Sequence, residues 1–237
     1  MPSSVSELNA FGQPVGPLVA GWIAPEPPAD APMPGRFCSV RPLDPAADRD
    51  ALFQAFAEDD GRMWTYLPFE AARDPDELER LLRYFQKEFQ PFGIVETASG
   101  DLVGAASYMR RNAAAGSIEV GAVMFSPRLQ RRPAATEAMF LMMKRAFEAG
   151  YRRYEWKCHA LNAASRAAAE RLGFTFEGVF RQDAIYKQRS RDTAWYSIID
   201  SEWPAARDAF EAWLAPDNFD GDGRQRRALA ELRRRAA

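Results

Sequence analysis

The chain has 237 residues, 47% of them hydrophobic, which suits one domain with a sizeable core and some additions. Its 33 acidic and 31 basic side chains leave a net charge of -2, so the overall balance favours neither nucleic acid nor an anionic membrane as a partner. Cys38 and Cys158 stand far apart and His159 is the single histidine, which argues against a metal site and for a reduced, cytoplasmic protein.

Residues 1–36 are expected to form an extended arm. They hold eight of the 17 prolines and lack a sustained apolar period, so no hydrogen-bond ladder is predicted, and Trp22 and Ile23 are expected to anchor the arm. The N-terminus lacks the basic and apolar regions of a secretory signal, and no window approaches the roughly 20 apolar residues of a spanning helix. Neither export nor membrane insertion is predicted.

Strand-like and helical patterns then predict a mixed α/β domain over about residues 37–200, with a helical extension at 201–237. In chain order, the first predicted elements are a strand at 37–41, a helix after Pro45, a helix from Asp74, and strands at 92–96 and 102–108 joined by a turn at 98–101. Next come a strand at 118–125, a helix at 135–148, a strand at 154–158 and a helix at 162–172. The last are strands near 174–176 and 184–199, a helix after Pro204 and a basic helical end at 224–235.

The turn between the strand at 118–125 and the helix at 135–148 is a candidate anion site. Such a turn presents unpaired backbone N–H groups at the positive end of the helix dipole. Its arginines add charge and donors, and the small Ala134 and Ala135 allow a pyrophosphate to approach closely. Without a second signal, an ordinary exposed basic turn is the more common explanation of these residues.

The second signal is the segment 161–179. Asn162 suits a helix N-cap and Gly173 a left-handed stop, so each residue also has a purely structural explanation. The turn has the pattern Gln-x-x-small-x-Ala-Thr-Glu at 130–137, and it is followed by Asn-x-x-Ser at 162–165, Leu-Gly-Phe and Glu-Gly. Together these motifs resemble those of the GCN5-related N-acetyltransferases (GNAT), in particular the ribosomal-protein-alanine type.

The resemblance implies an α/β (α+β) GNAT fold over about residues 37–200, a mixed and mostly antiparallel sheet with helices on both faces. It also implies that acetyl coenzyme A binds where two central strands diverge. The residues that would hold this co-substrate are the backbone near Met124, the turn residues Gln130, Arg131, Arg132, Ala134, Ala135 and Thr136, and beyond them Asn162 and Ser165. The family commonly has Gly where this chain has Pro133, which donates no N–H; at a helix start that donor has no intrahelical partner anyway.

The implied reaction is direct transfer of an acetyl group to a primary amine, without metal. Glu119 matches the strand position from which family members often deprotonate the amine through water; an exposed or salt-bridged strand residue is the alternative. Ser165 is a candidate proton donor to the departing sulfur, or simply a first-turn helix residue. Tyr186 is a further candidate acid.

The acceptor amine stays open, because similar chains acetylate protein N-termini or small amines. Trp64, Tyr66 and Phe69 form an aromatic segment that would line an acceptor pocket or pack against the second helix. The terminal additions leave a homodimer open as well. The alternatives to an enzyme are a catalytically silent acyl-coenzyme-A-binding or regulatory module and an interaction domain that no longer binds the cofactor.

Overall fold

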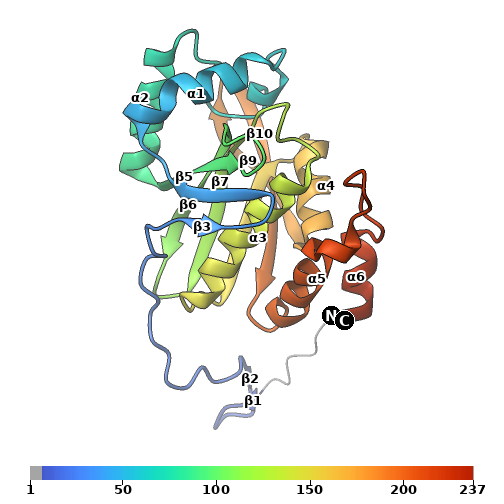
Figure 1. Cartoon of the computed structure of the whole chain (residues 1–237). Coiled ribbons are helices and arrows are strands. Elements are labelled where there is room, and N and C mark those ends of the chain that lie inside the picture. Colours follow the sequence, from blue (N-terminus) through green and yellow to red (C-terminus); the bar gives the residue numbers. More distant parts are fainter. Residues whose placement is uncertain (1–6, 237) are drawn as a thin grey trace.

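The structure is a computed structural model of the chain, and it describes residues 7–236 (Figure 1). The strands are β1 (Glu7–Leu8), β2 (Pro14–Val15), β3 (Met33–Pro34), β4 (Cys38–Pro42), β5 (Gln90–Glu96), β6 (Leu102–Asn112), β7 (Ser117–Phe125), β8 (Arg153–His159), β9 (Thr175–Tyr186) and β10 (Arg189–Ile199). The helices are α1 (Pro45–Ala57), α2 (Pro75–Glu88), α3 (Pro133–Glu148), α4 (Ala163–Leu172), α5 (Trp203–Leu214) and α6 (Leu229–Ala236), with 3-10 turns η1 (Arg62–Trp64) and η2 (Pro216–Asn218).

Eight strands form one sheet in the order β3-β4-β5-β6-β7-β8-β10-β9. Within the described residues, β7 and β8 are its parallel pair, and the other neighbours run antiparallel. A parallel pair needs a crossover, and α3 supplies it between β7 and β8. The predicted mixed, mostly antiparallel α/β architecture is confirmed.

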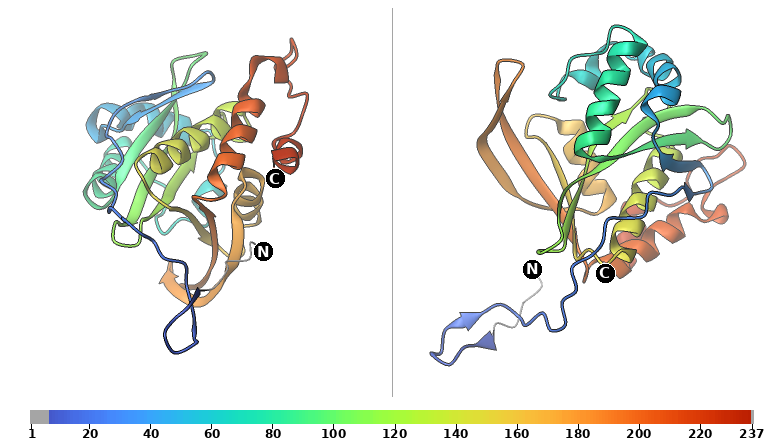
Figure 2. Two further views of the ribbon diagram at one scale, coloured as in Figure 1. Left: turned by 90° about the horizontal axis from the view of Figure 1, so that it is seen from below. Right: turned by 90° about the vertical axis from the view of Figure 1, so that its left-hand side faces the viewer.

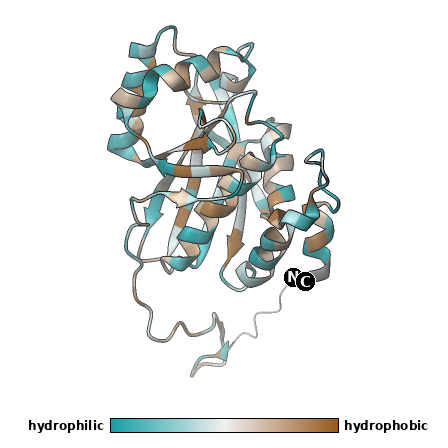
Figure 3. Cartoon of the chain, viewed as in Figure 1, coloured by the Kyte–Doolittle hydropathy of each residue, from teal (hydrophilic) through white to brown (hydrophobic). Residues whose placement is uncertain are grey.

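The sheet carries a hydrophobic core on each face. The larger core joins α3 to α5, α6 and the strands, with Met142 and Phe210 fully buried. The smaller core lies under α1 and α2 and includes Leu52 and Leu82. Figure 3 shows apolar residues concentrated in the central strands, with apolar and polar residues mixed along the helices. Helices packed on both faces of the sheet therefore support the start of α3 and the ends of β7 and β8.

The helix boundaries follow the capping chemistry of the sequence. The Asp74 carboxylate accepts the N–H of Glu77 and Pro75 opens α2, as the sequence predicts. Asn162 likewise caps α4 through the N–H of Ser165, and Gly173 ends that helix at a φ of 108°. Local chemistry thus fixes the residues at both ends of α4.

The prediction that the N-terminal arm has no hydrogen-bond ladder is wrong. β1 and β2 form a small hairpin, because the Asn9 side chain accepts the N–H groups of Phe11 and Gln13 and closes the turn. β3 also pairs with the first main strand, β4. Trp22 does contact the body of the protein, beside Gly116 and Arg152, but Ile23 is 83% exposed and anchors nothing.

The predicted strand boundaries after α4 are also wrong. β9 and β10 are long hairpin partners, and their turn at Lys187 and Gln188 has φ angles of 51° and 57°. Turns of this handedness normally contain Asn or Gly, so the sequence carries no turn signal here. The Lys187 ammonium instead bonds to the Trp64 carbonyl oxygen at 2.7 Å, which ties the hairpin tip to the segment between α1 and α2.

The basic C-terminal helix begins later than the predicted residue 224. The side-chain amide of Asn218 donates to the Arg227 carbonyl and its oxygen accepts the Arg227 N–H, so the preceding residues form a loop. α6 starts at Leu229 and packs Leu229 and Leu232 into the larger core. Among the helices of the described region, none is long and apolar enough to cross a membrane.

Candidate functional site

The two parallel strands at the centre of the sheet separate halfway along. β7 pairs with β8 from Ser117 to Val120, although β7 continues to Phe125 and β8 to His159. Ala122 has a φ of 48°, and the register between β6 and β7 shifts there. A bulge of this kind bends a strand, so it accounts for the divergence of β7 from β8. The predicted split between central strands is confirmed.

The turn after β7 leads from this split to the start of α3. Gln130 braces it by donating from Nε2 to the Phe125 carbonyl at 2.8 Å. Arg131 has a φ of 60°, a conformation that side-chain-bearing residues rarely adopt and that is found preferentially at functional sites. Residues 127–132 are thus held in one geometry by their own backbone and by Gln130.

Three backbone donors of this turn are free. The N–H groups of Leu129, Gln130, Arg132 and Ala135 donate to carbonyls within residues 126–132, whereas those of Arg128, Arg131 and Ala134 have no acceptor among residues 7–236. Pro133 stands between the last two as the first residue of α3, where it contributes no donor. The free N–H groups, at the positive helix end, suit a bound anion.

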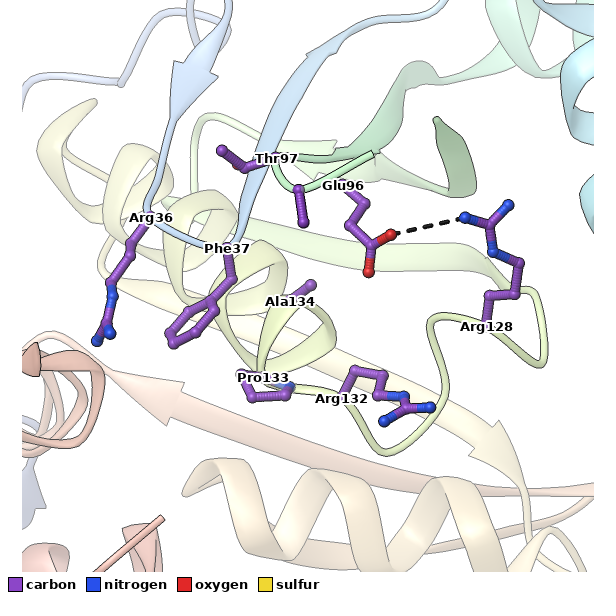
Figure 4. A pocket seen from close by; sticks show the side chains of 9 residues that line it. Arg36, Phe37, Glu96, Thr97, Arg128, Arg132, Pro133 and Ala134 are labelled. Atoms are coloured by element: carbon purple, nitrogen blue, oxygen red, sulfur yellow. Dashed lines mark ion pairs between the residues drawn. The ribbon is translucent and has the colours of Figure 1, made fainter. Parts of the chain in front are cut away.

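The turn arginines differ in their availability. Arg128 is engaged by Asp101 at 2.6 Å and lies 3.6 Å from Glu96. Arg131 and Arg132 are exposed and form no ion pair with any described residue. A cavity of about 460 Å³ opens beside Arg132, as Figure 4 shows, and its lining residues are Arg36, Phe37, Glu96, Thr97, Ala98, Arg128, Arg132, Pro133 and Ala134.

The remaining turn residues face the protein interior. Thr136 is buried, and its hydroxyl accepts a hydrogen bond from the Arg171 guanidinium at 2.9 Å. Burial lowers the pKa of Arg171, whose charge also lies over the Trp213 ring. Ala134 is buried as well, and its short side chain leaves room for an anion to approach the free N–H group.

Glu119 lies on β7 next to the point of divergence. Its carboxylate is buried and has a cation at each oxygen: Arg110 donates to Oε1 at 2.8 Å, and Nζ of Lys157 lies 2.9 Å from Oε2. Lys157 also lies 3.0 Å from Glu155 and 3.6 Å from the ring centroid of Trp195. Glu119 is therefore the salt-bridged strand residue that the sequence left as one alternative.

A ladder of charges continues from Lys157 along the same face of the sheet. Arg153 binds Glu155 at 2.8 Å and donates two hydrogen bonds to Glu177, which also accepts the Ser197 hydroxyl. Sequence reasoning missed Lys157 and its partners. The signal is the strict alternation of β8, where Arg153, Glu155, Lys157 and His159 face one side and apolar residues face the other.

Several polar atoms on this face are buried without a hydrogen bond. Within residues 7–236, seven such side-chain atoms occur, and four of them belong to Glu119 and to β10 residues: Oε2 of Glu119, which has Lys157 as its ion-pair partner, Nε of Arg191, Oγ1 of Thr193 and Nε1 of Trp195. Buried polar groups are normally hydrogen-bonded. Unpaired groups on one sheet face are consistent with a site that receives a polar molecule.

Ser165 belongs to a different contact set. Its hydroxyl accepts the indole N–H of Trp156 at 3.0 Å, and Asn162 caps the backbone of the same turn. Cys158 lies close to Ser165, and burial raises the pKa of its thiol, so the thiol stays protonated and is a poor nucleophile. Met124, the predicted backbone donor, packs its side chain into the smaller core.

The candidate acceptor side is bounded by aromatic residues and by the β9–β10 hairpin. The Tyr186 hydroxyl donates to the Tyr66 carbonyl oxygen at 3.1 Å, and the Tyr66 ring lies 5.1 Å from that of His159. Burial raises the pKa of Tyr186 and, with the charge of Arg191, lowers the pKa of His159.

The other two aromatic candidates pack elsewhere. Trp64 lies against Phe56 of α1, and Phe69 lies against Phe85 of α2. The side chains of Trp64 and Phe69 therefore follow the packing alternative. Of the three aromatic rings, the Tyr66 ring lies beside His159, and the Trp64 carbonyl oxygen binds Lys187 of the hairpin.

Comparison with known proteins gives one family. The model of the acetyltransferase (GNAT) domain matches residues 39–175. A GCN5-related N-acetyltransferase from Brucella melitensis is 44% identical, with a TM-score of 0.88, over 90% of this chain and 99% of that chain. A chain from Chromobacterium violaceum ATCC 12472, described as a probable acetyltransferase (GNAT family), is 41% identical over 81% of this chain and 98% of its own, with a TM-score of 0.77.

A more distant similarity concerns the fold alone. The acetyltransferase from Salmonella typhimurium that modifies the N-terminal serine of 50S ribosomal subunit protein L7/L12 is 19% identical, with a TM-score of 0.60, over 71% of this chain and 98% of that chain. No match was found among curated proteins. The split β7–β8 pair, the turn before α3 and the match over residues 39–175 lead to the same conclusion: the chain belongs to the GCN5-related N-acetyltransferase family.

Proposed function

We propose that the protein is an acetyl-coenzyme-A-dependent N-acetyltransferase that transfers an acetyl group directly to a primary amine. The observation that carries the proposal is the position of the donor-rich turn at the mouth of the β7–β8 split, with the Glu119 carboxylate beside that split. Family membership supports acetyl transfer, and the residues present suit its chemistry.

The turn is the proposed pyrophosphate site. The free N–H groups of Arg131 and Ala134 and the unpaired guanidinium groups of Arg131 and Arg132 are the donors that a diphosphate requires. Gln130, Ala135 and Thr136 shape the turn. The backbone near Met124, together with Asn162 and Ser165, is proposed to contact the acyl and pantetheine part within the split.

The reaction requires proton transfers at two places. The amine nitrogen forms the new C–N bond, the thioester C–S bond breaks, the amine proton goes to Glu119 through water, and the thiolate takes a proton from an acid. Ser165 and Tyr186 are the two candidate acids. The Ser165 hydroxyl accepts from Trp156 and keeps its own proton available, whereas burial raises the pKa of Tyr186 and so makes it the weaker acid. The protonated Cys158 thiol gives no support to a covalent acyl-enzyme.

The proposed acceptor is a protein N-terminus or a small amine. It would lie on the polar face that carries Glu119 and the unpaired β10 groups, below the hairpin tip that Tyr186 and Lys187 fasten to the aromatic segment. The free thiols of Cys38 and Cys158 fit the cytoplasmic location that we include in this proposal.

Two measurements test the proposal. Calorimetric titration with acetyl coenzyme A should give saturable binding, and an amine panel that includes peptides with varied N-termini should give release of free coenzyme A with at least one member. Absence of binding at millimolar co-substrate would overturn both the enzyme and any coenzyme-A-binding role.

Two observations favour a second candidate, a catalytically silent acyl-coenzyme-A-binding module. Both Glu119 oxygens lie beside cations, and Pro133 removes one donor from the turn. This candidate predicts saturable binding with no amine-dependent release of coenzyme A across the whole panel, so the same pair of measurements separates it from the enzyme.

A further inference from the structure

The N-terminal arm presents an unusual surface to solvent. Seven large apolar side chains are exposed in the described part of the arm, residues 7–36, with Phe11 at 87% and Ile23 at 83%; the set is Leu8, Phe11, Val15, Leu18, Val19, Trp22 and Ile23. Figure 2 shows the β1–β2 hairpin projecting beyond the body of the protein. A two-stranded hairpin without a covered face is marginally stable in water, so this arm lacks a packing partner.

The charge of the arm indicates what kind of partner it fits. Residues 7–24 contain one charged side chain, Glu7, and no Lys or Arg occurs before Arg36. Anionic lipid surfaces and nucleic acids are bound through basic side chains, which the arm does not offer. An uncharged apolar arm fits an apolar protein surface instead.

The same chain carries an exposed apolar strand edge. β9 is the last strand of the sheet and pairs only with β10 among the described strands. Its residues Phe176, Val179 and Phe180 are exposed, and Glu177, the charge among them, is already bound by Arg153 and Ser197. An exposed strand edge of this composition is a template for added strands.

The β9 surface begins at the end of the sheet that holds the arm. Trp22 holds the arm at Arg152, and the neighbouring Arg153 holds Glu177 of β9. From there β9 runs through Val179 and Phe180 towards the level of His159. A two-fold axis beside this end would let the arm of each copy reach β9 of the other. We propose that the protein forms a homodimer in which each N-terminal arm packs on the β9 edge of the partner copy.

The exposed area is sufficient for a stable dimer. The seven arm residues and the three β9 residues, at roughly 100 Å² for each large apolar side chain, would bury about 1,000 Å² per copy. Specific interfaces bury about 800 Å² per partner. The interface is isologous, because each copy supplies both the arm and the edge.

Sedimentation velocity on the full chain provides the first test. Wild type should sediment as a species of twice 26.6 kDa. The arm variant Phe11→Ser/Leu18→Ser and the edge variant Val179→Lys should each sediment as monomers, and both change exposed side chains. Leu161→Ser, at an exposed apolar residue outside both surfaces, is the matched control and should remain dimeric.

Mixing the two variants provides the second test. The arm variant keeps an intact β9, and the edge variant keeps an intact arm, so an equimolar mixture should regain dimers through one arm–edge contact. Leu18→Cys mixed with Val179→Cys should form a disulfide between chains, while Cys38 and Cys158 stay buried.

Three results would overturn the proposal. One is a monomeric wild type at about 100 µM, a concentration at which even weak specific interfaces of this size associate. Another is a dimer that persists in both variants. The third is a disulfide confined to a single chain when Leu18→Cys and Val179→Cys are combined in one protein, since the arm would then pack on its own β9.

Discussion

Oε2 of Glu119 lies 2.9 Å from Nζ of Lys157 but outside hydrogen-bonding geometry, while the second oxygen accepts a hydrogen bond from Arg110. The contact between Glu119 and Lys157 is therefore an ion pair buried in the sheet, with Glu155 as a second carboxylate at 3.0 Å from the same ammonium. The Lys157 ammonium thus holds the Glu119 carboxylate in position on β7.

Lys157→Met should destabilise the protein by about 3–5 kcal/mol, because it leaves Glu119 and Glu155 buried without their shared cation. Chemical denaturation measures this loss. In the folded variant, Glu119 loses the cation that holds its carboxylate, so turnover should fall while the affinity for acetyl coenzyme A stays unchanged. Lys157→Arg keeps the charge and should restore most of the stability and turnover; unchanged turnover in a folded Lys157→Met protein would exclude Lys157 as a positioning residue.

Glu119→Gln should lower turnover by about 100-fold or more, the usual effect of removing a general base, with the affinity for acetyl coenzyme A unchanged. Steady-state rates with excess co-substrate and calorimetric titration measure the two quantities. Glu155→Gln is the matched control, because Glu155 shares the Lys157 contact and lies one strand away. Equal losses in both variants would assign Glu119 to the ion network and remove it as the base.

Much of the fold follows from local signals in the sequence. Asp74 and Pro75 mark the start of α2, and Gly173 marks the end of α4, because capping chemistry acts within a few residues. The β9–β10 turn escaped prediction because Lys187 and Gln188 adopt positive φ without a Gly or Asn. That turn depends on a tertiary contact, the Lys187 bond to the Trp64 carbonyl.

The candidate site also has one part that the sequence predicts and one part that it does not. The turn before α3 is local, so its backbone donors could be anticipated from the strand, the turn and the helix in order. The environment of Glu119 could not be anticipated, because it depends on the register of the parallel strands β7 and β8. In this register Glu119 lies opposite Glu155, which brings Glu119 close to Lys157. Parallel register is not encoded by any turn that joins the two strands.

Pro133→Gly should tighten acetyl coenzyme A binding by up to about tenfold, because it adds one backbone donor to a phosphate site. It should also lower the stability by about 1 kcal/mol, since the preset φ is lost. Pro45→Gly is the matched control, because Pro45 begins α1 away from the turn. It should show a comparable loss of stability without a change in affinity; weaker binding in Pro133→Gly would mean that the proline itself shapes the turn.

Acidification should remove the stabilisation that Glu177 provides. The hydrogen bonds from Arg153 lower the pKa of Glu177 in the folded protein, so the folded state binds its proton less readily than the unfolded state. The contribution is fully present above the unfolded pKa of about 4.3 and is lost as the pH falls through the lower folded value. The Tm difference between wild type and Glu177→Gln should therefore shrink from pH 7 to pH 3, and Glu211→Gln, at an exposed site, should show no such trend.

Glu137 should be a major determinant of stability. Its carboxylate accepts the backbone N–H groups of Arg36, Phe37 and Cys38 at 2.6–2.8 Å and so fastens the entry of β4 to α3. Glu137→Gln turns an amide N–H₂ towards these donors, so we expect a loss of about 3 kcal/mol in chemical denaturation. Glu148→Gln, at an exposed residue of the same helix, should have little effect.

The thiol of Cys38 reports this contact independently. Burial, followed by the charge of Glu137, raises the pKa of Cys38 and makes the thiol unreactive in the folded protein. If the Glu137 contact holds β4 against α3, the modification rate of Cys38 by a thiol reagent should rise in Glu137→Gln well below its unfolding midpoint. Cys158, which lies on β8 away from this contact, should keep its wild-type rate, because the change opens the β4 edge and leaves the centre of the sheet intact.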